Sequence, residues 1–400
     1  MSARRVVVTG LGAVSAAGVG APALLDLMLG ERSAVRPWPE LGGLPVGAAP
    51  EPPPDRRTRR LDRAARLFVA AGEEAWRDAG LAAAPDDPDR CAVLEGSSLG
   101  SLADLLSEHE KFLAVADRRP PSPLMLVRYM PGAGGALLAQ AHRVAGPVFH
   151  LSAGSVSATC AIGEAYLKIA CGSVDVALAG GAECPLHPEI AAAFRAAGIL
   201  AQNNGAPAAC RPFDRRRAGT VLGEGAGALV LESAEHARNR GARVRAVVTG
   251  YGVACEAASM TAPDPEGRGV AAAARQALCA AGATAVGWVK THGTGTRLND
   301  AAECRGLQAV FGDALPDVPL TALKPALGHS MGASGGVETV AAALALERGI
   351  IPPTIGSEEV DPDLPPCTIA RRAEATDARA VLLLAESFGG RCAALVIERV

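Results

Sequence analysis

Short runs of apolar, often β-branched residues alternate along the chain with longer stretches that are rich in alanine. Apolar runs of this length are typical of buried strands, and alanine-rich stretches with a helical period are typical of helices. Strands are therefore predicted at residues 175–179 and 287–290, and helices at residues 161–170, 269–281 and 335–347. This alternation predicts an α/β fold built from layers of helix and sheet.

The apolar run that opens the chain has a near copy in the second half. Residues 6–12 read Val-Val-Val-Thr-Gly-Leu-Gly, and residues 247–252 read Val-Val-Thr-Gly-Tyr-Gly. An arginine precedes each copy, and each copy begins about half of the chain. Such a repeat indicates an internal duplication, so we expect an N-terminal half of residues 1–240 and a C-terminal half of residues 241–400. If each half supplies one sheet between helices, the halves pack into five layers in the order α-β-α-β-α.

The glycines that end each near copy are expected to form tight turns from strand to helix. The first copy lacks the third glycine of a dinucleotide-binding fingerprint, and no acidic residue follows at the expected distance, so nucleotide binding is not favoured. Residues 37–60 are rich in proline and arginine and are expected to form an exposed loop. Residues 100–135 carry few strand signals, and we expect an insertion there that builds a pocket wall or a dimer contact.

Composition narrows the classes of function. The 400 residues are 49% hydrophobic but only 3% aromatic, so the cores must be built from Ala, Val and Leu. A net charge of −3 gives no electrostatic case for binding nucleic acid or an anionic membrane. No apolar run reaches the roughly 20 residues that span a bilayer, and no signal peptide is recognised, which predicts a cytoplasmic protein. The ten cysteines include no CxxC pair, so no metal site is predicted.

Two of the seven histidines lie in glycine-rich turns after predicted strands. His292 begins the sequence His-Gly-Thr-Gly-Thr, directly after a strand that ends at Lys290. His329 ends the sequence Lys-Pro-Ala-Leu-Gly-His, which starts at Lys324 and precedes an alanine-rich helix. A lone histidine is more often a core or surface residue, but two histidines in matched turns favour a catalytic pair.

In these motifs the chain resembles the β-ketoacyl-acyl-carrier-protein synthases, the condensing enzymes of fatty-acid and type II polyketide synthesis. The resemblance runs nearly from end to end and includes both histidine motifs, Arg-Pro-Phe-Asp at 211–214, Gly-Glu-Gly-Ala-Gly at 223–227, Ala-Gly-Gly-Ala-Glu at 179–183 and Ser-Phe-Gly-Gly at 387–390. It implies an internally duplicated thiolase fold of five layers. It also implies a protein of polyketide or fatty-acid biosynthesis that acts on carrier-bound acyl groups.

The nucleophile of that family is a cysteine in a pattern like Thr-Ala-Cys-x-x-Gly, on a turn from a strand into a buried helix. Counting back without gaps from residues 179–183 places Ser155 at this position. Cys160 lies five residues further on, more than one helical turn away, so we expect it to be a packing residue. Ala153 and Gly154 also depart from the pattern, which indicates natural divergence of the site rather than an engineered change from cysteine.

The resemblance implies the other residues of the site. His292 and His329 would act as oxyanion donors or as a base, Lys324 would orient or bias His329, and Glu303 would help to fix this network. The supporting positions are Thr294, Thr296, Phe388, Gly389 and Gly390. The gate of the family, Phe-Gly-Phe-Gly-Gly, reads Glu-Ser-Phe-Gly-Gly at residues 386–390, and the Thr-Asn after it reads Arg-Cys.

A serine in place of the cysteine changes the expected chemistry. A serine hydroxyl is not ionised at neutral pH and needs an adjacent base during attack, and a serine ester is a poorer acceptor for a carbanion than a thioester. We therefore expect Ser155 to support acyl transfer more readily than condensation. Two alternatives stay open: a subunit like a chain-length factor that shapes the tunnel of a cysteine-bearing ketosynthase, and a malonyl-carrier decarboxylase that needs no nucleophile at position 155.

The resemblance also implies partners. No metal or organic cofactor is expected, since the phosphopantetheine arm of an acyl carrier protein would deliver the substrate. Carrier proteins are acidic, so the arginines at 215–217 are docking candidates, although a solvated loop is the simpler interpretation for them and for the basic residues at 56–60. Family members pair through the strand before the nucleophile turn, here residues 148–152. A homodimer, or a heterodimer with another ketosynthase-fold subunit, is therefore expected.

Overall fold

The computed structural model describes residues 3–82, 84–114, 123–201, 210–283 and 285–400. The helices are α1 (Ala21–Leu29), α2 (Arg63–Asp78), α3 (Leu102–Ala114), α4 (Met125–Arg128), α5 (Ala133–Ala141), α6 (Ser157–Ala170), α7 (Pro188–Ala196), α8 (Ala234–Asn239), α9 (Arg268–Ala281), α10 (Arg297–Phe311), α11 (Lys324–Leu327) and α12 (Ser334–Arg348). The strands are β1 (Val6–Ser15), β2 (Gly18–Val19), β3 (Arg36–Trp38), β4 (Leu44–Gly47), β5 (Cys91–Gly96), β6 (Val148–Leu151), β7 (Val176–Glu183), β8 (Leu222–Gly223), β9 (Gly225–Ser233), β10 (Ala246–Cys255), β11 (Trp288–Lys290), β12 (Leu320–Thr321), β13 (Ile350–Ile351), β14 (Glu374–Ala375), β15 (Ala380–Ser387) and β16 (Arg391–Glu398).

The two halves of the chain repeat one sheet topology. The strand order is β1-β9-β7-β5-β6 in the first half and β10-β16-β15-β11-β12 in the second. In both halves the first two pairs of this order are antiparallel and the last two are parallel. The internal duplication that the near repeat predicts is therefore confirmed.

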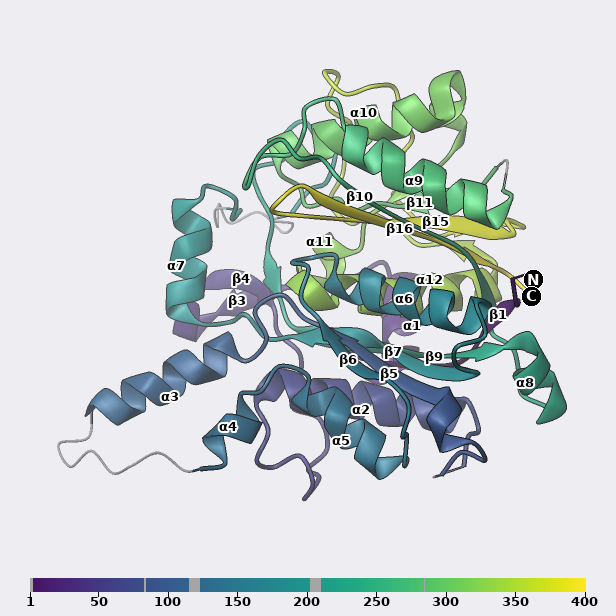
Figure 1. The fold of residues 1–400 in the computed structure, drawn as a ribbon. Helices are drawn as coiled ribbons and strands as arrows, with labels where there is room; N and C mark the ends of the chain where they lie inside the picture. Colours follow the sequence, from purple (N-terminus) through teal and green to yellow (C-terminus); the bar gives the residue numbers. More distant parts are fainter. Residues whose placement is uncertain (1–2, 83, 115–122, 202–209, 284) are drawn as a thin grey trace.

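Figure 1 shows how the layers stack. Helices α2 and α5 cover the outer face of one sheet, α9 and α10 cover the outer face of the other, and α6, α12 and α1 lie between the sheets. This is the five-layered α-β-α-β-α arrangement of the thiolase fold expected from the sequence. The two copies of the near repeat join the sheets, because β1 and β10 are paired antiparallel from Val6 opposite Val248 to Val8 opposite Ala246.

The glycines of the near repeat do not form the expected turns from strand to helix. Gly10 lies within β1 and Gly250 within β10, rather than in turns from strand to helix. Both positions exclude a side chain because an outer helix passes close to the strand. A Cβ atom at Gly10 would lie 2.0 Å from the carbonyl oxygen of Ala75 in α2, and one at Gly250 would lie 2.0 Å from that of Ala277 in α9. The repeated glycines thus mark repeated helix-on-strand packing.

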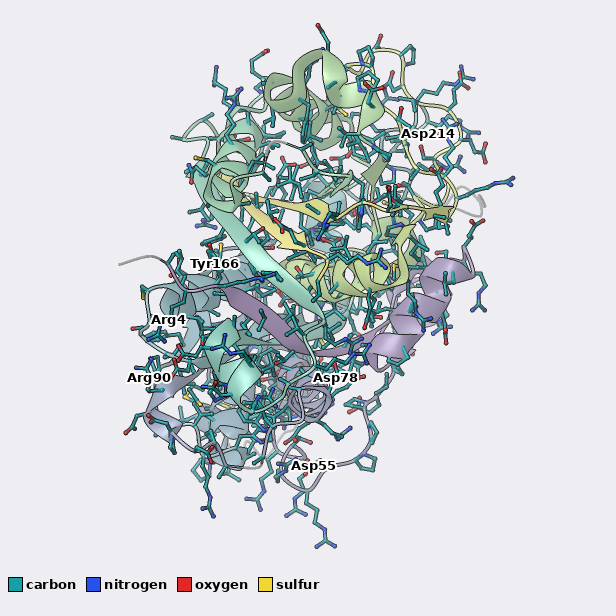
Figure 2. The ribbon with its side chains drawn as sticks, turned by 90° about the vertical axis from the view of Figure 1, so that its right-hand side faces the viewer. Arg4, Asp55, Asp78, Arg90, Tyr166 and Asp214 are labelled. Atoms are coloured by element: carbon teal, nitrogen blue, oxygen red, sulfur yellow. The ribbon has the colours of Figure 1, made fainter. Side chains whose placement is uncertain are left out.

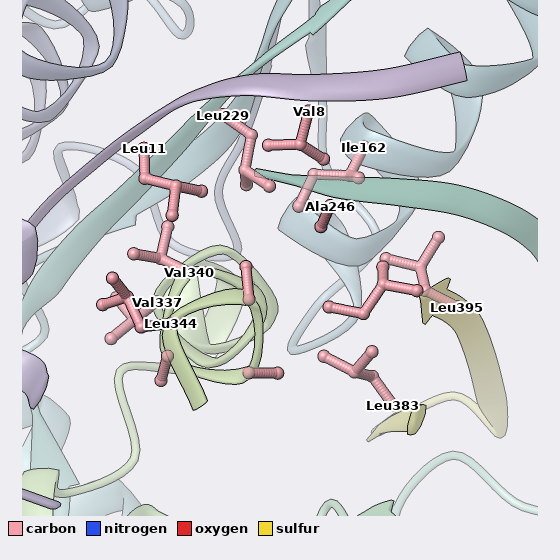
Figure 3. Packing of buried hydrophobic residues seen from close by; sticks show 14 of the residues in the cluster. Val8, Leu11, Ile162, Leu229, Ala246, Val337, Val340, Leu344, Leu383 and Leu395 are labelled. Atoms are coloured by element: carbon pink, nitrogen blue, oxygen red, sulfur yellow. The ribbon is translucent and has the colours of Figure 1, made fainter. Parts of the chain in front are cut away.

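Three hydrophobic clusters fill the spaces between the layers. The central cluster packs α6 and α12 between the two sheets, and Figure 3 shows part of it, with Val340 of α12 beside Leu11 of β1. The other two clusters lie under α2 and α5 and under α9 and α10. Many of their members are alanines, and these small side chains let the helices approach the sheets closely.

Partly exposed ion pairs lie on the outside of the layers. Arg4 and Arg90 both pair with Asp175, the residue before β7, at N···O distances of 2.7 and 2.5 Å. Figure 2 shows both arginines on the same side of the molecule. Because these side chains are partly exposed, such pairs contribute at most about 1 kcal/mol each, and the stability of the fold rests on the apolar clusters.

Most of the predicted elements are present. The predicted helices correspond to α6, α9 and α12, and the predicted strands to β7 and β11.

Residues 37–60 are less loop-like than expected, because they supply most of β3 and all of β4, which form a small sheet with β8. The insertion at 100–135 is mostly helical where it is described, and its residues 115–122 lie outside the described residues. The boundary between the halves at residue 240 stays a prediction. Among the described helices, none has the length and apolar character needed to cross a membrane.

We predict that Gly10→Ala lowers the free energy of unfolding by about 3 kcal/mol, because the new Cβ atom must displace a backbone carbonyl between packed layers. Gly30→Ala is the matched control, since Gly30 is exposed, has a φ of −78° and would first meet the flexible side chain of Arg32. Denaturant unfolding should place this control within about 0.5 kcal/mol of the wild type. Equal losses in the two variants would contradict the close packing of β1 on α2.

Candidate active site

Ser155 lies in the turn between β6 and α6, and only 6% of its surface is exposed. Gly154 precedes it with a φ of +69°, a conformation that residues with a Cβ atom rarely adopt. The hydroxyl of Ser157 fixes the turn by accepting the N–H of Ala153 at 2.9 Å and donating to the carbonyl oxygen of Gly154 at 2.6 Å. The turn therefore holds Ser155 rigidly before the first turn of α6.

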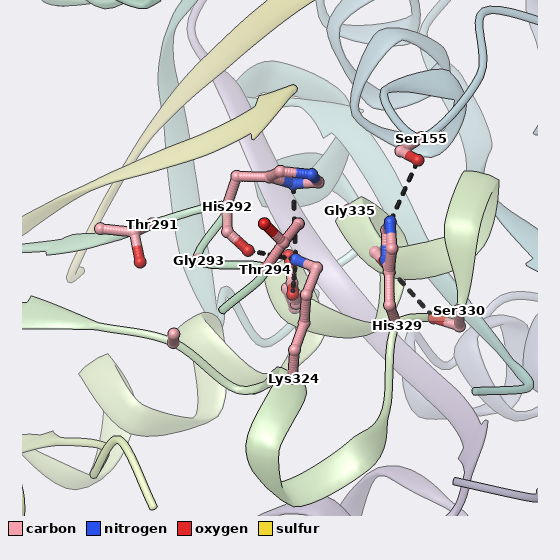
Figure 4. Close-up of polar contacts among 12 residues, drawn as sticks. Ser155, Thr291, His292, Gly293, Thr294, Lys324, His329, Ser330 and Gly335 are labelled. Carbon is pink, nitrogen blue, oxygen red and sulfur yellow. Dashed lines mark hydrogen bonds and ion pairs between the residues drawn. The ribbon is translucent and has the colours of Figure 1, made fainter. Parts of the chain in front are cut away.

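His329 reaches Ser155 from the corresponding turn of the second half, between β12 and α12. Its Nε2 atom lies 3.2 Å from Oγ of Ser155, as Figure 4 shows. The helices that follow the two turns touch, since a Cβ atom at Gly335 would lie only 2.0 Å from Oγ1 of Thr159. The duplicated topology thus brings the serine and the histidine together.

One hydroxyl lies beside the other ring nitrogen of His329, and a second hydroxyl contacts the first. Nδ1 is 2.9 Å from Oγ of Ser334, which in turn is 3.3 Å from Oγ of Ser330. If Nδ1 carries the proton and donates it to Ser334, Nε2 is a base facing Ser155; if Ser334 donates to Nδ1, Nε2 is a donor. Burial, reinforced by nearby lysine cations, holds the pKa of His329 well below its usual range, so the ring is neutral.

His292 follows β11 and lies edge-on to His329, with the ring centroids 5.3 Å apart. The ammonium of Lys324 lies 3.4 Å from Nδ1 of His292 and also donates to the carbonyl oxygen of the same residue. Because an ammonium can only donate, Nδ1 is the acceptor and Nε2 carries the proton. His292 is therefore a hydrogen-bond donor, and burial together with Lys324 holds its pKa well below the usual range.

Lys324 thus contacts and orients His292, whereas on His329 it has the biasing effect expected from the sequence, because, together with burial, its charge helps to lower the pKa of that ring. Its ammonium donates to Glu338 of α12 at 3.0 Å, and Lys290 at the end of β11 pairs with the same carboxylate. These three charged side chains are 1–4% exposed. Lys290 and Glu338 are parts of the site that were not predicted from the sequence. The available signals were a lysine that ends a buried strand and a glutamate within an apolar helix.

Glu303 of α10 holds the turn that carries His292. Its carboxylate accepts the backbone N–H groups of His292 and Gly293, the second at 2.9 Å, which is the fixing role expected of it. The hydroxyls of Thr294 and Thr296 lie 2.9 Å apart in the same turn. Burial raises the pKa of Glu303 to about 7. The histidine turn is therefore anchored by a carboxyl group that titrates near neutral pH.

Ser155 and both histidines line one cavity of about 470 Å³. Its wall also includes Thr294, Thr296, Phe388, Gly389, Gly390, Glu256, Glu386, Ser387, Arg391 and Cys392. All supporting residues named from the sequence are therefore in the wall. Lys324 and Glu303 contact His292 but are not among the described residues that line the cavity. Phe388 is 45% exposed, which places it toward the mouth of the cavity.

Ser387 covers the backbone N–H of Ser155. Its Oγ accepts this N–H at 2.9 Å, and the missing side chain of Gly154 makes room for it, since a Cβ atom there would lie 1.9 Å from the same oxygen. The N–H of a nucleophilic serine is a usual donor to the oxyanion of acyl transfer. In this chain the hydroxyl of Ser387 already accepts this N–H. The sequence pattern at 386–390 contains this serine, but only the fold shows that it contacts the turn of Ser155.

Cys160 behaves as expected of a packing residue. It lies within α6, is partly buried and packs with Val156, Ala385 and Ala393. Burial raises the pKa of its thiol, which disfavours the reactive thiolate. Cys160 is not among the described residues that line the cavity. The structure therefore favours Ser155 over Cys160 as the reactive residue of the cavity.

The arginines at 215–217 do not form a free basic patch. Arg217 is only 4% exposed and pairs with Asp361, so the expectation of an exposed docking residue is wrong there. Arg216 and Arg215 are exposed, but both pair with acidic residues of the same chain. Figure 2 labels Asp214, one of these acids, which is itself fully buried. Any carrier that docks here would compete with these pairs.

Two domains of one protein family match the chain. Residues 51–237 match "Beta-ketoacyl synthase, N-terminal domain", and residues 245–358 match "Beta-ketoacyl synthase, C-terminal domain". The tetracenomycin polyketide synthase ketoacyl synthase alpha subunit of Streptomyces glaucescens is 34% identical over 417 residues, with 99% of this chain and 97% of that protein covered. Nodulation protein E of Rhizobium meliloti (strain 1021) is 37% identical over 371 residues, with 90% of each chain covered.

Solved structures are similar over the whole chain. The ishigamide ketosynthase/chain length factor has a TM-score of 0.90 and 34% sequence identity, with all of both chains covered. A structure of a type II PKS acyl-carrier protein in complex with its ketosynthase bound to the hexaketide includes a chain with a TM-score of 0.90 and 28% identity, again with all of both chains covered.

We predict that Ser387→Ala speeds the reaction of Ser155 with an acyl thioester about tenfold, because it frees the backbone N–H of Ser155 for the developing oxyanion. Single-turnover release of thiol from the thioester measures this rate. Ser387→Thr keeps the hydroxyl and is the control that should match the wild type. A slower Ser387→Ala would show instead that the hydroxyl itself is the oxyanion donor.

Proposed function

The chain belongs to the β-ketoacyl synthase family, and we propose that it transfers acyl groups from acyl carrier proteins in polyketide or fatty-acid biosynthesis. The resemblance stated from the sequence is confirmed, because the two family matches together cover most of the chain. The observation that carries the proposal is the 3.2 Å contact between Oγ of Ser155 and Nε2 of His329 in the cavity wall. A hydroxyl beside a neutral imidazole is the arrangement that activates serine for acyl transfer.

In the proposed step, Oγ of Ser155 attacks the carbonyl carbon of the thioester while Nε2 of His329 takes the hydroxyl proton. The C–S bond then breaks, the acyl group stays on Oγ as an ester, and the thiolate of the phosphopantetheine arm leaves with the proton from Nε2. His329 must carry its own proton on Nδ1, and Ser334 is placed to accept it at 2.9 Å. His292 donates from Nε2 to the carbonyl oxygen as negative charge develops there.

The acyl ester on Ser155 limits the reactions that the acyl group can undergo next. Its oxygen donates into the carbonyl more strongly than sulfur does, so a carbanion adds to it less readily than to a thioester. Transfer of the acyl group to a better nucleophile, or hydrolysis, is affected less. The proposed activity is therefore acyl transfer, with condensation as a slow reaction of the same site.

The partners we propose rest on the similar proteins and on one sheet edge. β6 is the last strand of its sheet, and Val148 and Phe149 are 37% and 50% exposed. An exposed strand edge is available for pairing with another chain. One similar structure is a ketosynthase/chain length factor, and another contains an acyl-carrier protein with its ketosynthase. We infer that β6 pairs with a second copy or with another ketosynthase-fold subunit, and that a carrier protein supplies the substrate.

The histidine pair supports decarboxylation as a second candidate function. Breaking the bond between the carboxylate and the α-carbon of a malonyl thioester releases CO₂ and leaves the electron pair on an enolate. His292 presents an N–H donor fixed by Lys324, and His329 becomes a second donor when Ser334 donates to it. Two donors are what an enolate oxygen needs. A subunit that only shapes the tunnel of a partner would not need these donors, so their presence favours catalysis.

We predict that Ser155→Ala abolishes thiol release from an acyl carrier protein, because the acceptor oxygen is gone. Ser155→Cys should condense an acyl and a malonyl carrier at least about tenfold faster than the wild type, since a thioester is the better acceptor. Single-turnover assays on the purified chain, alone and with a ketosynthase partner, measure both reactions. Ser173→Ala is an exposed control that should match the wild type. Equal thiol release from Ser155→Ala and the wild type would exclude Ser155 as the nucleophile.

For the decarboxylation candidate, we predict that CO₂ release from a malonyl carrier survives Ser155→Ala. It should fall at least about 100-fold in His292→Ala, because one of the two enolate donors is lost. Gas release from labelled malonyl groups measures both variants. Loss of CO₂ release in Ser155→Ala would remove this candidate, because the hydroxyl has no part in the proposed decarboxylation.

A further inference from the structure

A second cluster of polar side chains lies in the cavity wall and takes no part in the proposed acyl transfer. It consists of Glu256, Glu386 and Cys392, all of which line the cavity. One oxygen of each carboxyl group and Sγ of Cys392 lie within 4.8 Å of one another. Two of these residues replace other residues of the family pattern, in which position 386 is a phenylalanine and position 392 an asparagine. At these two positions the cluster therefore departs from the family pattern.

The register of the sheet brings the three residues together. Glu386 lies opposite Cys392 in the β15–β16 pair, and Ala254 lies opposite Cys392 in the β10–β16 pair. Side chains alternate between the faces of a sheet, so Glu256, two residues beyond Ala254, shares their face. More than 100 positions separate Glu256 from the other two along the chain. The expectation of no metal site rested on the spacing of cysteines along the chain. Such spacing cannot reveal a cluster that contains one cysteine and two distant glutamates.

Glu386 is buried without a partner. Only 4% of its surface is exposed, and its Oε1 atom has no hydrogen-bond partner. Within the part of the chain that the structure describes, neither Glu386 nor Glu256 forms an ion pair. Glu256 accepts the N–H of Asp264 at 2.9 Å through one oxygen, and its other oxygen is 4.0 Å from Sγ of Cys392. Buried polar atoms are normally satisfied, so the free oxygen of Glu386 points to a ligand.

The backbone around the cluster makes room for its side chains. A Cβ atom at Gly269, at the start of α9, would lie 2.6 Å from Cγ of Glu256 and 2.8 Å from Sγ of Cys392. Any larger residue at this position would therefore push two of the three side chains away. The N–H of Glu256 donates to the carbonyl oxygen of Gly390 at 2.8 Å, which fixes the end of β10 to the hairpin that carries Phe388. The cluster is thus built into the base of the cavity gate.

We propose that Glu256, Glu386 and Cys392 bind one divalent metal ion of the zinc class. Zn²⁺ accepts both thiolate and carboxylate ligands, and three protein ligands leave a fourth position open. Because all three side chains line the cavity, the open position faces the cavity. The thiol decides between a metal and an organic ammonium group, since sulfur is a good ligand for zinc but a weak hydrogen-bond acceptor. The bound ion ties β10, β15 and β16 together beside Phe388.

The test is a cobalt titration of the chelator-treated full chain, with Co²⁺ as a spectroscopic substitute for Zn²⁺. The wild type should bind one equivalent of Co²⁺ and show a thiolate-to-cobalt charge-transfer band, which Zn²⁺ then removes by displacement. Cys392→Ser should lose the band, and Glu386→Gln should bind at least tenfold more weakly. Cys255→Ser is the matched control, because Cys255 is exposed and precedes Glu256 on the opposite face of β10. It should bind as the wild type does.

Unfolding midpoints without and with Zn²⁺ show whether each variant folds. The wild type and Cys255→Ser should gain stability with Zn²⁺, whereas Cys392→Ser and Glu386→Gln should not. If Cys392→Ser does not fold, Glu256→Gln takes its place and should also weaken binding at least tenfold. No stoichiometric binding, or a band that persists in Cys392→Ser, would overturn the site. Ser155→Ala should bind Co²⁺ normally, so failure of the acyl-transfer proposal and failure of this one are separable.

Discussion

The first turns of α6 and α12 touch, and the geometry of the whole site depends on this contact. Gly335 has no side chain to separate the helices, so the hydroxyl of Thr159 occupies the space that a Cβ atom would take. The turns that precede the helices therefore meet, and Oγ of Ser155 lies 3.2 Å from Nε2 of His329. The joined sheets hold both helices in place, because β1 and β10 are hydrogen-bonded to each other at the centre of the molecule. A separation of even one side chain would abolish the serine–histidine contact.

Buried charge gives the two histidines different roles. Lys290, Glu338 and Lys324 form a connected group behind the cavity, and its lysines help to keep both imidazoles neutral. Lys324 occupies Nδ1 of His292, which makes this ring a donor through Nε2. His329 instead meets a hydroxyl that can both donate and accept, so it can serve as a base or as a donor. One neutral ring with a fixed tautomer and one with two allowed tautomers suit acyl transfer, and they also suit decarboxylation.

The sequence predicted the fold and the main site residues because these depend on pattern and order. The near repeat predicted the duplication, and His292, His329 and Ser155 each follow a predicted strand in a recognisable motif. The repeat predicts turns at its glycines because glycine is most often a turn residue, whereas in the structure Gly10 lies within a strand and allows close helix packing. Likewise Arg217 is buried against Asp361, although a run of arginines is usually solvated.

Other features were beyond reach of the sequence because they are contacts between distant residues. Ser387 covers the N–H of Ser155 from 232 positions away, and Glu256 joins Glu386 only through the register of the sheet. The hydrogen bond from Lys324 to His292 also required the position of the ammonium. Each of these contacts lies in the cavity wall or next to it, at positions that the order of residues along the chain does not bring together.

The central claim is that Ser155 carries the acyl group. The most direct measurement is to incubate the full chain with an acyl carrier protein, quench the reaction, digest the protein and locate the added mass on its peptides. The account predicts the acyl mass on the hydroxyl of Ser155 and no added mass in Ser155→Ala. An acyl group on Cys160, or thioester consumption that leaves Ser155 unmodified at every time point, would contradict it.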